Sequence, residues 1–92
     1  MRILLFSIED GDYGVPLELV REVIAFPDIR PLPNVPPHFL GIMTLRDQVI
    51  PVVDLRIRLG LTPTLTHDTA VMIYTIDGQQ LGLVVDTIHT VL

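Results

Sequence analysis

The apolar residues of this chain come in short runs, and each run ends at a glycine, a proline or a polar turn residue. Runs this short are typical of β-strands, because an amphipathic helix needs roughly 10 to 12 residues and a different spacing. None approaches the roughly 20 apolar residues of a helix that crosses a bilayer. The pattern predicts an all-β domain with short helical turns, with strands at 2–8, 13–16, 40–46, 49–55, 70–76 and 80–86.

Three short connections have the composition of tight turns. Asp-Gly-Asp at 10–12 and Asp-Gly at 77–78 predict hairpins, since Asp-Gly readily takes positive φ. Asp-Gln at 47–48 is just long enough for a two-residue hairpin between the strands at 40–46 and 49–55. The chain ends on an apolar alternation at 88–92, which predicts a final strand.

Two segments break the strand pattern. Leu17, Val20 and Ile24 have helical spacing, so a short helical turn is expected to run into a strand that ends near Phe26. Residues 27–37 contain five prolines, which no regular helix or central strand accommodates. This segment is expected to be a rigid, extended loop.

Residues 56–60 predict one helical turn that follows a strand directly. Asp54 is expected to cap its start, and Gly60 its end. Arg56 and Arg58 are interpreted as a solvated face, because exposed ion pairs to a carboxylate such as Asp86 add only about 0–1 kcal/mol.

Composition excludes several classes of function. The net charge is −5 and there is no lysine, so the sequence does not predict the patch of basic residues that binding a nucleic acid requires. It has no cysteine, which excludes disulfides, thiolate zinc sites and a cysteine nucleophile. The histidines are expected at the surface, and without metal-ligand spacing they predict neither a metal nor a cofactor: His38, His67 and His89. No signal peptide is recognised, so the expected location is the cytoplasm, without membrane insertion.

An internal similarity suggests how the chain is organised. Residues 10–20 align with 77–88, each as a turn, a glycine-led strand, an acidic residue and apolar residues. A repeat of this kind predicts a complete first unit at 1–68 and only the first strands of a second unit at 69–92. An incomplete second unit would leave a sheet edge open, and 49% of the residues are hydrophobic. A homodimer through this edge is therefore expected.

Residues 40–56 resemble the signature of CheW-like domains, in which Gly and apolar residues precede Asn-Leu-Arg-Gly and a Pro-Val-apolar-Asp-Leu strand. Here the motif reads Thr-Leu-Arg-Asp, with Asp47 in place of the family glycine. A typical member continues for about another 50 residues, so the chain resembles one truncated at its C-terminus. Four further segments agree with the family in the same order: 13–17, 20–23, 32–36 and 83–86.

The resemblance implies SH3-like β-barrels and a non-catalytic adaptor role in bacterial chemotaxis. Such an adaptor couples a chemosensory histidine kinase to transmembrane chemoreceptors. Its expected partners are the regulatory domain of the kinase, through apolar contacts at a barrel end, and the cytoplasmic tip of a receptor. The positions that the family pattern points to as partner contacts are Val20, Glu22, Gly41, Leu45 and Arg46.

Two other functions stay open at this point. Asp54, Asp86 and His89 would gather around one pocket if the chain were a small β-barrel enzyme or a ligand-binding domain. Alternatively, the CheW-like module would be part of a larger kinase or of a fused adaptor.

Overall fold

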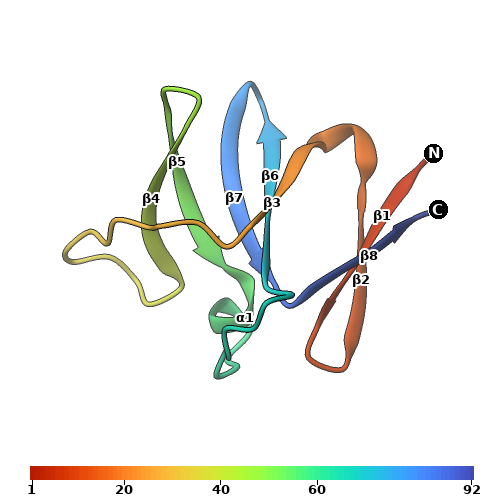
Figure 1. Ribbon diagram of the computed structural model, residues 1–92, viewed down its shortest axis with the longest axis horizontal. Coiled ribbons are helices and arrows are strands. Elements are labelled where there is room, and N and C mark those ends of the chain that lie inside the picture. The colour runs from red at the N-terminus through yellow and green to blue at the C-terminus, as the bar shows by residue number, and fades with distance from the viewer.

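The structure is a computed structural model that describes residues 1–92, and it is built almost entirely of strands (Figure 1). A 3₁₀ turn and a single turn of α-helix interrupt them, and neither is long enough to cross a membrane. The elements in chain order are β1 (Ile3–Ile8), β2 (Gly11–Pro16), η1 (Leu17–Leu19), β3 (Val20–Ala25), β4 (Phe39–Leu45), β5 (Gln48–Asp54), α1 (Leu55–Arg58), β6 (Ala70–Ile76), β7 (Gln79–Val85) and β8 (Thr87–Val91).

The strands form two sheets. The smaller sheet has the order β2-β1-β8 and is antiparallel, so the N- and C-terminal ends of the chain lie side by side in Figure 1. The larger sheet has the order β3-β6-β7-β5-β4, and only β5 and β7 pair in parallel. The prediction of a mostly β fold with short helical turns is confirmed.

Alternation along the strands builds two hydrophobic clusters. Leu4, Phe6 and Ile8 point to one side of β1 and pack with Met72 and Val85. β6 is apolar on both sides, because its residues alternate between this cluster and the other, which explains its unbroken run of buried residues. The second cluster lies against the larger sheet and contains Met43, Ile50, Val52, Val71, Ile73 and Val84.

The larger sheet curls without closing. Its two edge strands, β3 and β4, are joined only by the segment after β3, where Arg30 and Ile42 exchange two backbone hydrogen bonds of 2.8 and 2.9 Å. The expected complete SH3-like barrel is therefore observed as an open, curled sheet with a single bridge between its edges. The proline-rich loop crosses this opening in Figure 1.

The strand pairing does not follow the boundary expected near residue 68. The expected second unit would hold β6 and β7 apart, but they lie between β3 and β5 in the larger sheet, and β8 pairs with β1. The internal similarity concerns strands that are adjacent in the sequence, so it does not indicate how distant strands pair. The parallel contact of Val52–Asp54 with Gly82–Val84 inserts the late hairpin among the earlier strands.

Candidate functional site

Two of the predicted contact residues, Glu22 and Arg46, form an exposed ion pair. The hairpin between β4 and β5 turns at Arg46 and Asp47, which both have positive φ (49° and 64°), and not at the predicted Asp47 and Gln48. This turn sends the Arg46 side chain toward β3. Its Nη2 donates to Glu22 Oε2 at 3.0 Å, and its Nη1 donates to Oε1.

The pair is charged and open to solvent. The hydrogen bond from Arg46 lowers the pKa of Glu22 against a smaller opposing effect of burial, and the same bond raises the pKa of Arg46. The Arg46 side chain is 63% exposed and that of Glu22 only 24%. Glu22 therefore holds the guanidinium in one orientation while leaving much of its surface free for a partner.

The other three predicted residues are not exposed contact groups of this kind. Val20 is partly buried and packs against the cluster around Phe6, whereas Leu45 is partly buried against the cluster around Ile50. These two side chains support the strands on either side of the ion pair. They do not form one continuous surface with it.

Gly41 is buried and has a conformational role. Its φ is +144°, and a Cβ at this position would lie 2.1 Å from the carbonyl oxygen of Arg30. The backbone of the proline-rich loop reaches β4 here, beside the bridge between Arg30 and Ile42. Only glycine leaves room for this approach.

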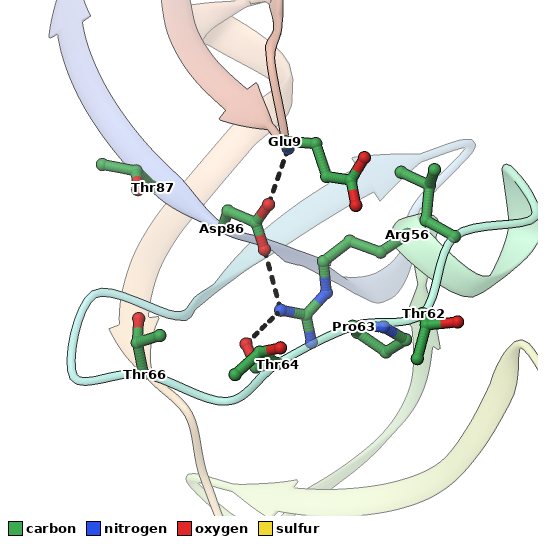
Figure 2. Close-up of a pocket in the computed structure, with 9 residues that line it drawn as sticks. Glu9, Arg56, Thr62, Pro63, Thr64, Thr66, Asp86 and Thr87 are labelled. Carbon is green, nitrogen blue, oxygen red and sulfur yellow. Dashed lines mark hydrogen bonds and ion pairs between the residues drawn. The ribbon is translucent and has the colours of Figure 1, made fainter.

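A second polar cluster centres on Arg56, which is buried rather than solvated as the sequence predicts. It is only 3% exposed. Its Nε and Nη2 each donate to an Asp54 carboxylate oxygen at 3.0 Å, and its Nη1 donates to Asp86 at 2.8 Å and to the Thr64 carbonyl oxygen at 3.1 Å. Figure 2 shows the Asp86 and Thr64 bonds.

This arrangement links four parts of the chain. Asp54 also accepts the Arg56 backbone N–H at 2.9 Å, which confirms the predicted helix cap. Asp86 also accepts the Glu9 backbone N–H at 2.7 Å, from the turn between β1 and β2. Burial raises the pKa of Asp86, but the Glu9 N–H and the Arg56 guanidinium together outweigh it and lower the pKa.

The three residues proposed for an enzymatic pocket do not come together in one. A cavity of about 260 Å³ lies beside Arg56, and Asp86 lines it, but Asp54 and His89 do not. The side-chain hydrogen bonds of Asp54 are made to Arg56 alone. His89 is instead hydrogen-bonded through Nε2 to Ser7, on the neighbouring strand. No group of three or more His, Asp or Glu side chains is arranged to hold a metal ion.

Ser7, Asp12 and His89 form a small cluster that sequence reasoning missed. Ser7 Oγ donates to Asp12 Oδ1 at 2.7 Å, and His89 Nε2 lies 3.8 Å from the same oxygen. The three side chains come from three adjacent strands, and 82 positions separate Ser7 from His89. No spacing rule connects residues so far apart, so only strand pairing could have found the cluster.

Known proteins match this chain along nearly its whole length. Residues 2–92 match the CheW-like domain. The chain is 30% identical to the chemotaxis protein CheW of Rhizobium meliloti over 93 residues, or 98% of this chain and 59% of that protein. It is 27% identical to the CheW of Bacillus subtilis over 99% of this chain and 59% of that protein.

A solved structure shows the same fold. The crystal structure of the scaffolding protein TtCheW from Thermoanaerobacter tengcongensis superposes with a TM-score of 0.93 at 36% sequence identity, covering 99% of this chain and 63% of that one. The chain thus spans about three fifths of the length of these relatives. Because the family match extends over residues 2–92 and the fold agrees, the chain belongs to the CheW-like domain family.

Proposed function

We propose that this chain is a non-catalytic adaptor of bacterial chemotaxis, acting in the cytoplasm to couple a chemosensory histidine kinase to chemoreceptors. The observation that carries this is the exposed, bidentate Glu22–Arg46 pair. It lies at the position that the family motif points to, in a chain whose relatives are named as chemotaxis proteins CheW.

The receptor tip is the proposed partner of the ion pair. Arg46 keeps donors and an open face after it binds Glu22, so it can also contact a carboxylate or a backbone carbonyl of a receptor helix. Val20 and Leu45 act from beneath, by fixing the strands that carry the two charges. Gly41 acts in the same way, by seating the proline-rich loop on β4.

The kinase regulatory domain is the proposed partner of the hairpin ends of the larger sheet. The β4–β5 and β6–β7 turns lie at the same end of the molecule in Figure 1. Val49 and Ile76 lie beside these turns and are 63% and 50% exposed. Apolar side chains at the end of a sheet suit a packing contact with another domain.

The mechanism is positional. A chain that binds kinase and receptor together raises the effective concentration of each near the other. It also transmits a receptor state to the kinase if it binds the two kinase states with different affinity. No bond is made or broken, and the same contacts would serve if this domain were a module of a larger kinase or of a fused adaptor.

Arg46→Ala is expected to weaken receptor binding and to leave the fold intact. The side chain is exposed, and its removal deprives the surface of a charged hydrogen-bond donor without opening a cavity. Pull-down with a receptor cytoplasmic fragment measures the binding, and circular dichroism with thermal melting measures the fold. Arg21→Ala is the matched control, since this exposed arginine lies on β3 and makes no side-chain ion pair. Unchanged receptor binding by Arg46→Ala would count against the proposal.

A further inference from the structure

The proline-rich loop between β3 and β4 contains an exposed segment that the adaptor proposal does not use. Arg30, Pro31, Leu32 and Pro33 are all exposed, and 37% of Leu32 is open to solvent. Figure 1 shows the loop projecting sideways beyond β4. A loop of more than about 12 residues without helix or strand is uncommon in a compact domain, and it usually has a function when it is ordered. The chemistry of these four residues indicates what kind of surface they fit.

Two successive X-Pro units restrict the backbone of this segment. Each proline fixes its own φ near about −65°, and it also moves the residue before it out of the helical region. Arg30 and Leu32 each precede a proline, so the four residues favour the extended polyproline II conformation. The run ends at Asn34, whose φ is +60°. The covalent structure of the segment therefore favours one extended conformation before any partner binds.

Contacts with β4 hold the start of the segment in place. Arg30 exchanges two backbone hydrogen bonds with Ile42, at 2.8 and 2.9 Å. Pro31 lies against the same strand, since its Cα is 2.9 Å from the place that a Cβ of Gly41 would occupy. A segment that is restricted in this way before binding loses little conformational entropy when a partner binds it.

The outward surface of the segment is an apolar ridge with a positive charge one turn away. Polyproline II has three residues per turn, so Arg30 and Pro33 share one edge of the segment and Leu32 lies on the next edge. Pro31 is on the third edge, the one that faces β4. None of the ion pairs of the structure involves Arg30, so its guanidinium is free to pair with a partner.

We propose that Arg30–Pro33 binds a partner protein in a shallow groove that is lined by aromatic side chains and has a carboxylate at one end. Aromatic rings suit the ridge, because their flat faces pack against the proline ring and Leu32. The carboxylate would accept two parallel hydrogen bonds from the Arg30 guanidinium. Pairing with a β-strand suits the segment less, since Pro31 and Pro33 have no N–H to donate to a ladder. This contact goes beyond the adaptor proposal, because it uses neither Arg46 nor the hairpin ends.

The size of the segment predicts a weak contact. Four exposed residues bury far less than the roughly 800 Å² per partner of a stable interface. The restricted backbone offsets part of this loss, because the segment is already in the conformation that the groove would bind. We therefore expect a dissociation constant on the order of 100 µM.

A purified SH3 domain with a tryptophan and a carboxylate in its aromatic groove is the probe for this inference. It has the chemistry that the partner would need. The 92-residue chain contains no tryptophan, so the tryptophan fluorescence of the probe reports binding without a background from the chain. Titration of the probe with the wild-type chain is expected to give a saturable change in this fluorescence.

Three substitutions in the segment and one outside it locate the contact. Leu32→Ala and Pro33→Ala each remove part of the ridge and are expected to weaken binding at least about fivefold. Arg30→Gln is expected to weaken it about threefold and to make it less sensitive to salt, because a charge pair is lost. Pro37→Ala is the matched control, since this exposed proline lies in the same loop but outside the segment, and it should bind like the wild type.

Two results would overturn the inference. One is a fluorescence that does not change when the chain is raised to about 1 mM, well above the expected dissociation constant. The other is a Pro33→Ala variant that is folded by circular dichroism and binds as tightly as Pro37→Ala, which would put the contact outside the segment. Receptor binding is not measured in this experiment, so its failure is distinct from failure of the adaptor proposal.

Discussion

Arg56→Met is expected to lower the free energy of unfolding by about 3 to 5 kcal/mol, because it removes one member of a buried, paired charge cluster. Asp54, which is 2% exposed, would be left buried with no guanidinium beside it. The loss is a large share of the roughly 5 to 15 kcal/mol that stabilises a typical domain. Urea unfolding followed by circular dichroism measures it.

Arg58→Met is the control for this prediction. Arg58 lies two positions away in the same helical turn, is exposed, and makes no ion pair. Its replacement is expected to change the free energy of unfolding by less than about 0.5 kcal/mol. If the two substitutions had equal effects, the hydrogen bonds of Arg56 to Asp54, Asp86 and Thr64 would not contribute to stability.

The Arg56 cluster also predicts a dependence of stability on acid. The pKa of Asp86 is lowered in the folded chain, so its contribution is present above the unfolded value of 3.8 and is lost as pH falls through the folded value. Arg56→Met removes one of the groups that lower this pKa. Urea midpoints measured between about pH 6 and pH 2.5 should therefore fall less steeply with acid in the variant than in the wild type.

Gly41→Ala is expected to destabilise the fold by roughly 3 to 5 kcal/mol. The new Cβ would lie 2.1 Å from the Arg30 carbonyl oxygen and 2.9 Å from the Pro31 Cα, so the backbone of the proline-rich loop must move. Moving it breaks the two hydrogen bonds between Arg30 and Ile42, and alanine is strained at a φ of +144°. Chemical denaturation measures the loss.

Gly60→Ala is a control that separates the cost of backbone strain at a positive φ from the cost of the steric clash of a new Cβ. Gly60 has a φ of +83°, and a Cβ there would meet nothing within 4 Å. Only the conformational cost of about 1 to 2 kcal/mol is expected. If Gly41→Ala were no worse than Gly60→Ala, the close approach of the loop to β4 would not contribute to stability, and Gly41 would be better explained as a partner contact.

Local patterns predicted the strands well and the turns less well. Short apolar runs predict seven of the eight strands to within a few residues, because alternation and turn composition act between neighbours in sequence. For β3 the prediction gives only an end near Phe26. The β4–β5 turn was placed one residue late, since Arg46 adopts a positive φ that few non-glycine residues take. The resemblance identified Glu22 and Arg46, but nothing in the sequence indicated that the two form an ion pair with each other.

The sequence by itself determined the all-β class, the hairpins, the cap at Asp54 and the family, since each depends on contiguous residues. The tertiary structure alone decided the strand order, the curl that brings β3 to the β4–β5 turn, and the burial of Arg56. These depend on the parallel pairing of β5 with β7 and on contacts between residues far apart in the sequence, such as Arg56 with Asp86 and Val20 with Tyr74. A charge pattern does not reveal whether an arginine is solvated, because that depends on which distant segments pack around it, here those that carry Thr64 and Asp86.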